Sequence, residues 1–436
     1  MTPSFEEKEI STVLQSFPSL QMDEDKRREI ASHIRREREL LVQMKRRKKY
    51  AKVIGGAVAS FALLFIAYQW MPSEVTPLVP SAQQTNAGES QKAQAAETTS
   101  QTDKVLTLDS QIQVYIEEAL HKTSKAYQPE NMTVIVTDPN TGEILGMNLK
   151  KQDANDRVPD IVKAKPDPVA AFPIVTLAAA IEEGKYKNYE TYESGTYEIT
   201  PGKFIKDHNN GAGWGQITYL EGIQRSSNVA FAKFSEQIPA DSLQQYFERF
   251  GFGAKTGIEQ INEQPGKIPN MDTPYDKALS AYGLGGSASA IQQVAAVGAI
   301  ANGGELMKPH VTREERNHID KGRRVISEET AKQVREVLEV VVKNKPGLDT
   351  AFSIKEHTVA GRTGIAEKRD QQGNFIEGKY TYSFIGFAPS DDPKLLVYIA
   401  VDEPKTDLWV KLWGQEIVAP PFKEIMENSL QYLQQR

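Results

Sequence analysis

A run of 21 residues without any charged side chain, residues 53–73, constrains this chain more than any other feature of its sequence. Residues 53–68 are almost wholly apolar, and a helix of about 20 residues is long enough to cross the hydrocarbon core of a bilayer. A helix buried inside a globular core is also apolar on all sides. The residues on either side of the run therefore have to distinguish a membrane span from a core helix.

The charges on the two sides of this run are very unequal. Six basic residues lie between positions 45 and 52, whereas the first basic residue after the run is Lys92. Because basic residues stay on the cytoplasmic side of a bilayer, we expect residues 53–71 to form a single-pass transmembrane signal anchor, with the N-terminus in the cytoplasm and the C-terminal part outside the cell membrane. A cleaved signal peptide is the alternative, but 52 residues are long for the part that precedes its apolar core.

The segment before the expected anchor, residues 1–52, is basic and has a helical pattern. It carries 13 Lys and Arg against 9 Asp and Glu, a net charge of +4, which leaves −10 for the remaining residues because the whole chain has −6. Membrane topology and anionic lipid head groups account for this basic run. Two interpretations stay open: residues 1–50 dock a cytoplasmic partner, or they form a solvated stalk.

The composition changes again after the anchor. Residues 72–103 are rich in Ser, Thr, Gln, Ala and Pro and poor in large apolar residues, so they cannot bury enough surface to offset the entropy lost on folding. We expect a flexible extracytoplasmic linker there, and one globular domain over residues 104–436.

Composition also narrows the chemistry that is available. The chain has no cysteine, and its six histidines are scattered without a His-x-x-x-His pair, so we expect neither a metal site nor a cofactor. The acidic outer part has no basic surface that would suit nucleic acid.

Two apolar runs in the first part of the domain, residues 133–137 and 143–147, are separated by the turn sequence Asp-Pro-Asn-Thr-Gly. This pattern predicts a β-hairpin. The other elements that the sequence predicts are a helix that runs to Ala126, a strand pair at 382–387 and 395–401, and a closing helix at 422–435.

Pro168 and Pro173 precede an Ala-rich run, residues 174–183, which predicts a helix that ends at Gly184. The residue before a proline avoids the helical region, so we expect Phe172 to lie outside this helix. Pro173 suits the first helical turn, where an N–H group has no partner in any case.

Six segments of residues 104–436 resemble, in their order and spacing, the transpeptidase domain of class B penicillin-binding proteins, closest to the septal type of Gram-positive bacteria. The segments are 106–113, 138–147, 207–233, 282–304, 360–367 and 383–404. The resemblance implies an α/β fold of the α+β type, an antiparallel sheet flanked by helices as in serine β-lactamases. Class B members usually place a large pedestal domain between anchor and transpeptidase domain, and only the linker stands there in this sequence.

Members of this family carry three short active-site motifs, and two of them are recognisable here. The Ser-x-Asn motif is represented by Ser226 and Asn228, and the Lys-Thr-Gly motif by Arg362, Thr363 and Gly364, with arginine in place of lysine. The resemblance implies that the Ser-x-Asn pair holds the substrate amide and that the cation attracts the substrate carboxylate. An arginine fork can also grip a carboxylate.

The first motif, Ser-x-x-Lys, has lost both of its reactive residues. Ala170 stands at the place of the serine and Pro173 at the place of the lysine. In the family this serine attacks a D-Ala-D-Ala carbonyl and the lysine takes its proton, and losing the nucleophile of a serine hydrolase lowers turnover on the order of 10⁶-fold. The N–H groups of Ala170 and Ile365 are left to form an oxyanion hole, and Thr176 has no lysine placed to activate it.

The sequence therefore predicts a membrane-anchored pseudo-transpeptidase of a Gram-positive bacterium, which acts without catalysis as a scaffold, regulator or sensor in peptidoglycan synthesis or cell division. The partners implied are a peptidoglycan stem peptide or muropeptide and other cell-wall synthesis or division proteins. The alternative is an active D,D-transpeptidase or carboxypeptidase with an unrecognised nucleophile. Whether Ser226, Asn228 and Arg362 still bind a ligand or only stabilise the fold stays open.

Overall fold

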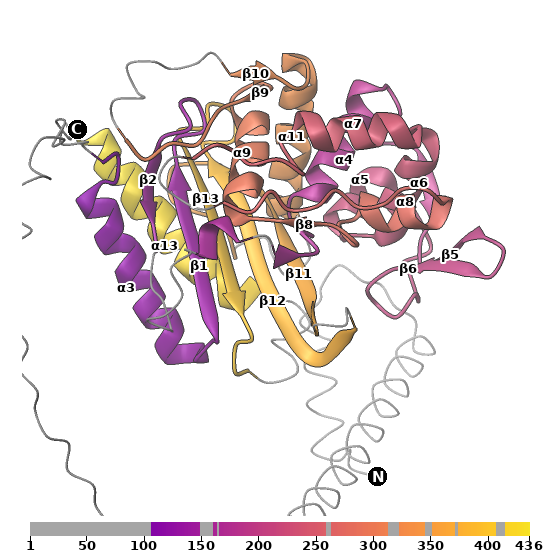
Figure 1. Ribbon diagram of the computed structural model, residues 1–436, viewed down its shortest axis with the longest axis horizontal. Coiled ribbons are helices and arrows are strands. Elements are labelled where there is room, and N and C mark those ends of the chain that lie inside the picture. Colours follow the sequence, from indigo (N-terminus) through magenta and orange to yellow (C-terminus); the bar gives the residue numbers. More distant parts are fainter. Residues whose placement is uncertain are drawn as a thin grey trace, which may run out of the picture. The chain divides into compact units, whose positions relative to one another are not determined.

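Five antiparallel strands in the order β11-β12-β13-β1-β2 form the central sheet (Figure 1). The strands are β1 (Asn131–Thr137), β2 (Ile144–Met147), β11 (Ala360–Arg369), β12 (Phe375–Ala388) and β13 (Leu395–Asp402). All eight residues of β13 are buried, because this central strand is covered on both faces and its side chains alternate between them. β11 pairs only with β12 and so forms one edge of the sheet.

The computed structural model describes residues 106–148, 160–163, 165–258, 263–312, 322–344, 351–370, 374–406 and 415–436. These residues belong to one compact unit, Thr98–Arg436. Within them no helix is both long and apolar enough for a membrane span. The expected cytoplasmic segment, anchor and linker lie outside the described residues, so the domain boundaries stay predictions.

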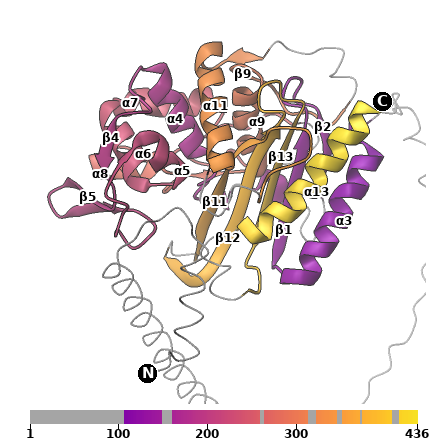
Figure 2. The same ribbon diagram turned by 180° about the vertical axis from the view of Figure 1, so that it is seen from behind.

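Two helices cover one face of the sheet, α3 (Ser110–Tyr127) and α13 (Gln415–Gln434), and they lie side by side although they come from opposite ends of the domain (Figures 1 and 2). Asp109 caps the N-terminus of helix α3, because its carboxylate accepts hydrogen bonds from the N–H groups of Gln111 and Ile112. Beneath α13, the ring of Phe384 stacks on Phe352 with centroids 3.8 Å apart and meets the edge of Phe422.

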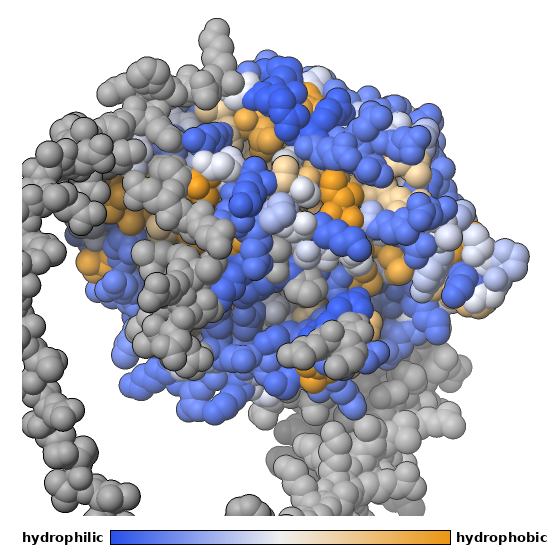
Figure 3. All heavy atoms as spheres, viewed as in Figure 1, coloured by the Kyte–Doolittle hydropathy of each residue, from blue (hydrophilic) through white to orange (hydrophobic). Residues whose placement is uncertain are grey.

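The opposite face carries a larger helical layer (Figure 2). Its helices are α4 (Phe172–Glu182), α5 (Tyr219–Gln224), α6 (Asn228–Gln237), α7 (Ala240–Arg249), α8 (Pro274–Ala281), α9 (Ala290–Ala301) and α11 (Glu328–Asn344). The short elements are η1 (Asp160–Val162), β3 (Lys165–Pro166), β4 (Thr191–Glu193), β5 (Thr196–Thr200), β6 (Lys203–Lys206), β7 (Gln216–Thr218), β8 (Ser287–Ala288), β9 (Glu305–Leu306) and β10 (Arg323–Arg324). Between helices and sheet lies one continuous apolar core, while the face seen in Figure 3 is mostly hydrophilic with small apolar patches.

Most of the expected elements are confirmed. The hairpin is β1–β2, and the C-terminal strand pair is β12–β13. β12 begins seven residues earlier than expected, because residues from Phe375 onward pair with β11. Helix α13 also begins seven residues earlier, at Gln415, and contains Pro420 and Pro421; Ile417 and Val418 are buried against the sheet, and this packing extends the helix ahead of the prolines.

The expectation for Phe172 is wrong, since it is the first residue of α4. Its N–H and that of Ala171 both donate to the carbonyl oxygen of Pro168, so helical geometry starts ahead of Pro173. The Phe172 ring is fully buried, 4.5 Å from the Phe247 ring. Tertiary packing of this ring outweighs the local preference of a residue that precedes proline.

Candidate functional site

The segment expected to match the first motif, residues 170–173, lies at the N-terminus of α4, where all four residues are buried. Ala170 is 1% exposed and precedes the helix by two residues. The helix cap, Ala171, makes no side-chain hydrogen bond, and the N–H groups of Phe172 and Ile174 in the first turn donate to backbone carbonyl oxygens. Position 170 thus combines a methyl group that cannot attack a carbonyl with a helix N-terminus that favours negative charge.

Strand β11 brings the third motif directly against this turn. A Cβ atom on Gly364 would lie 2.8 Å from the backbone N of Ala170 and 3.0 Å from its Cβ. Such distances are too short for any side chain at position 364, so glycine is required by the close approach of the strand. On the other side of Gly364, Ser383 of β12 donates a hydrogen bond to the Gly364 carbonyl oxygen at 3.3 Å.

Arg362 shares the face of β11 that Gly364 turns toward α4, because side chains two residues apart in a strand point the same way. It is 6% exposed, and its guanidinium lies 5.0 Å from the centre of the Phe231 ring in α6. Among the described residues, none forms a hydrogen bond with its Nε or Nη1. Burial lowers the pKa of Arg362 to about 10, so the side chain remains a cation at neutral pH.

The second motif begins at the C-terminal end of α5. Ser226 has φ 54°, the left-handed conformation common just after a helix, and the N–H groups of Ser226 and Ser227 donate to the Ile223 and Gly222 carbonyl oxygens at 3.0 and 2.8 Å. Ser227 caps α6 by accepting from the Ala230 N–H, and the Asn228 side chain donates to the Lys206 carbonyl oxygen at 2.9 Å. The motif is therefore held by contacts within the helical layer, and it meets the third motif where Arg362 covers Phe231, one helical turn after Asn228.

Two of the expected site residues lie elsewhere on β11. Strand alternation directs the side chains of Thr363 and Ile365 to the face opposite Arg362 and Gly364. Ile365 is 38% exposed there. The structure thus brings Ala170, Gly364 and Arg362 together, but not the side chains of Thr363 and Ile365.

Two buried carboxylates lie beside the motifs, and no sequence pattern indicated them separately. Asp167, just before the first motif, accepts from the Gly285 N–H at 2.8 Å and pairs with Arg369 Nε at 2.8 Å. Asp207 accepts from the Gly195 N–H and from two groups of the second motif. Only the location of Asp207 at the start of the similar segment 207–233 pointed toward the site.

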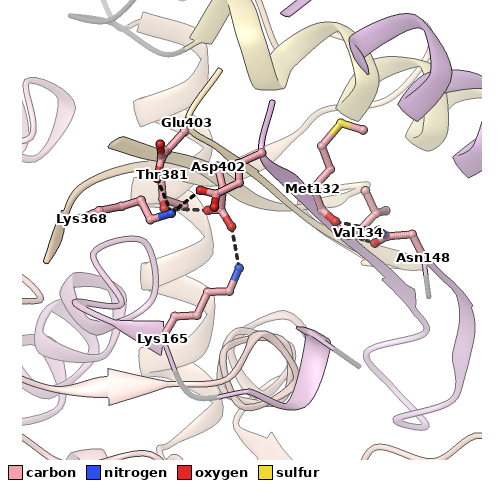
Figure 4. A network of polar contacts seen from close by, with 9 residues as sticks. Met132, Val134, Asn148, Lys165, Lys368, Thr381, Asp402 and Glu403 are labelled. Carbon is pink, nitrogen blue, oxygen red and sulfur yellow. Dashed lines mark hydrogen bonds and ion pairs between the residues drawn. The ribbon is translucent and has the colours of Figure 1, made fainter. Parts of the chain in front are cut away.

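A network of ion pairs joins the strand ahead of the first motif to the sheet (Figure 4). Lys165 pairs with Asp402 at 2.7 Å, and Thr381 donates to the same carboxylate. Lys368 bridges Glu403 and Glu130. Burial acts against the charged form of Glu403, but hydrogen bonds from Lys368 and Lys379 outweigh it and lower the pKa of Glu403 to about 2.

Asn148 follows β2 and extends its pairing with β1. Its side-chain oxygen accepts from the Val134 N–H, and its amide nitrogen donates to the Met132 carbonyl oxygen at 2.7 Å (Figure 4). The side chain thus replaces backbone partners where β2 ends. Across the described ranges, no group of three His, Cys, Asp or Glu side chains is placed to hold a metal ion.

Comparisons with known proteins agree with this architecture. Stage V sporulation protein D of Bacillus subtilis (strain 168) is 37% identical over 352 residues, which cover 75% of this chain and 53% of that protein. The probable peptidoglycan D,D-transpeptidase PenA of Neisseria meningitidis is 29% identical over 346 residues, 76% of this chain and 57% of that protein. The chain therefore spans little more than half the length of these two relatives.

A solved structure shows the same fold. The apo transpeptidase domain of penicillin-binding protein 3 from Burkholderia pseudomallei superposes with a TM-score of 0.66 and 25% identity, covering 77% of this chain and 98% of that domain. The family model described as the penicillin binding protein transpeptidase domain matches residues 132–427. With its five-stranded antiparallel sheet and flanking helices, this chain belongs to the family of penicillin-binding protein transpeptidase domains.

Proposed function

We propose that this protein is a membrane-anchored pseudo-transpeptidase that binds a D-Ala-D-Ala-ended stem peptide noncovalently and acts as a scaffold, regulator or sensor in peptidoglycan synthesis or cell division. The family and the relative named as a peptidoglycan D,D-transpeptidase support the substrate class. The degenerate first motif supports the absence of covalent turnover.

The observation that carries the proposal is the buried cation of Arg362. A charge taken out of water costs several kcal/mol unless a partner compensates it, and no described residue hydrogen-bonds its Nε or Nη1. A carboxylate bound beside it would provide that compensation through a charge-assisted hydrogen bond. The positive end of the α4 dipole lies near Ala170 and also favours an anion.

Thr176, which has no lysine placed to activate it, is fully buried in α4. Its hydroxyl forms no hydrogen bond with any described residue, so no base is placed to activate it, which supports binding without acylation.

Calorimetry with the outer domain and millimolar stem peptide tests the proposal. We expect weak, reversible binding, and a loss of roughly 10- to 150-fold for Arg362→Ala, the range of a charge-assisted hydrogen bond. Arg324→Ala is the matched control, because Arg324 is exposed and pairs with Glu305 on another hairpin. A peptide whose terminal carboxylate is replaced by an amide should bind as weakly to the wild type as the free acid binds to Arg362→Ala.

The scaffold and sensor roles differ in what the cytoplasmic segment does. A sensor needs a partner for residues 1–50, so capture of a specific protein by this segment favours it, and no capture favours the scaffold. Because one relative is named for stage V of sporulation, the stage at which the protein is made separates a division role from a sporulation role.

A further inference from the structure

The carboxylate of Asp207, beside the second motif, accepts three hydrogen bonds. It is 2% exposed and follows β6 directly. Its Oδ1 accepts from the Ser227 hydroxyl at 2.8 Å and from the Val229 N–H at 3.1 Å, and its Oδ2 accepts from the Gly195 N–H at 2.7 Å. Three donors compensate the buried charge, as a carboxylate in this position requires.

The backbone of Asp207 is fixed as firmly as its side chain. Its N–H donates to the Gly195 carbonyl oxygen at 2.8 Å, and its carbonyl oxygen accepts from the Gly211 N–H at 2.9 Å. Backbone hydrogen bonds on both sides therefore fix the position of Asp207 in its loop. Groups that it binds are held where the loop places them.

These groups belong to the residues that immediately follow Ser226. Asp207 binds Ser227 and Val229, and the carbonyl of the preceding residue, Lys206, accepts from the Asn228 side chain at 2.9 Å. Three consecutive residues after Ser226 are thus bonded to one dipeptide of the loop. The end of α5 holds Ser226 on one side, through the Ser226 and Ser227 N–H groups, and Asp207 holds the chain that follows it on the other side.

We propose that Asp207 is the positioning residue of the second motif: it sets where Ser226 and Asn228 stand, without itself contacting a ligand. This role belongs to the same site as the proposed function, but only the peptide-binding experiment described below rests on that function. Asp207 differs in this from an ordinary helix cap, because its hydroxyl and N–H partners fix the turn ahead of α6 as well as the helix start.

Amide hydrogen exchange on the intact outer domain tests the proposal without any ligand. Asp207→Asn keeps the shape but replaces one acceptor oxygen by a donor, which would face the Gly195 N–H. The Gly195 N–H loses its acceptor, and the oxygen that accepts from Ser227 and Val229 loses its charge. We expect the amides of Gly195, Val229 and Ala230, the last bonded to the Ser227 hydroxyl, to exchange roughly tenfold faster or more, the range for losing a charge-assisted hydrogen bond. Asp109→Asn is the matched control, because Asp109 also caps a helix with two N–H bonds, far from the motif.

Equal exchange at Val229 and Ala230 in Asp207→Asn and Asp109→Asn would overturn the proposal, since Asp207 would then act only on global stability. If Asp207→Asn does not fold, Ser227→Ala removes one of its donors at lower cost and must still accelerate exchange at Val229. In the binding arm, Asp207→Asn weakens stem-peptide binding roughly tenfold and Asp109→Asn leaves it unchanged. Absence of peptide binding to the wild type sinks the proposed function, while the exchange result still decides the role of Asp207.

Discussion

Gly364 and Ala170 approach each other so closely that a Cβ on Gly364 would lie 2.8 Å from the Ala170 backbone N and 2.8 Å from Ser383 Oγ. The contact joins the edge strand of the sheet to the first turn of α4. Residue 170 is an alanine and takes part in this contact through its backbone N and its Cβ. The close approach of β11 to α4 therefore does not depend on a reactive side chain at position 170.

Substitution of Gly364 should reveal how tightly this contact is packed. We expect Gly364→Ala to lower the free energy of unfolding by about 1–3 kcal/mol, because the Ala170 backbone and the Ser383 side chain must move to make room. Gly298→Ala in α9 is the control, since its Cβ would lie 3.9 Å from Pro139 Cβ and alanine favours a helix by about 0.5–1 kcal/mol. Urea unfolding of both variants measures the difference, and equal stabilities would contradict the tight contact.

Restoring the first motif tests whether only its two reactive residues are missing. The wild type should form no stable adduct with benzylpenicillin, because Ala170 has no nucleophilic atom. Ala170→Ser combined with Pro173→Lys should be acylated, and Ala170→Ser alone should react far more slowly for want of a base. Intact-mass spectrometry counts the adducts. A stoichiometric adduct on the wild type would refute the pseudoenzyme proposal, and an inert double variant would show that the other motifs have diverged too.

The buried charge of Arg362 should lower the free energy of unfolding of the domain. Arg362→Met keeps an unbranched side chain and removes a buried charge, so we expect the free energy of unfolding to rise by about 1–3 kcal/mol. The lost contact with the Phe231 ring is worth less, roughly 0.5–2 kcal/mol. Arg324→Met, at an exposed ion pair, should change stability by less than about 0.5 kcal/mol. A marked loss of stability in Arg362→Met would mean that the cation has a structural partner.

Glu403 should make the domain sensitive to acid. Its pKa is lowered from an ordinary 4.5 to about 2, so its ion pairs stabilise the folded state above the ordinary value and lose this effect as the pH falls toward 2. We expect Glu403→Gln to lower the free energy of unfolding by roughly 1–3 kcal/mol at neutral pH. The further loss of stability between pH 4.5 and 2 should be smaller in this variant than in the wild type. Glu305→Gln, at an exposed pair with Arg324, should change neither. Thermal unfolding between pH 2 and 7 gives both profiles.

Membrane topology remains a prediction from the charges around residues 53–71. Protease added outside intact protoplasts should remove the C-terminal domain and leave a short N-terminal fragment, because basic residues before the span keep that side in the cytoplasm. Moving the basic cluster from residues 45–52 to the linker should reverse the outcome. Protection of the C-terminal domain in the wild type would rule out the expected orientation.

The sequence alone determined which side-chain chemistry positions 170 and 173 can provide. Ala170 and Pro173 lack a nucleophile and a base in any fold, because these properties belong to the side-chain atoms themselves. Local patterns also determined the β1–β2 hairpin, since its turn residues and apolar runs lie next to each other in the chain.

Only the tertiary structure decided what the remaining residues do. Phe172 joins α4 because the rings of Phe247 and Phe252 enclose it, and these partners lie some 75–80 residues further along the chain. The burial of Arg362 over Phe231 and the hold of Asp207 on the second motif depend in the same way on segments far apart in sequence. Burial and hydrogen bonding are properties of a three-dimensional neighbourhood, and local spacing along the chain cannot specify such neighbours.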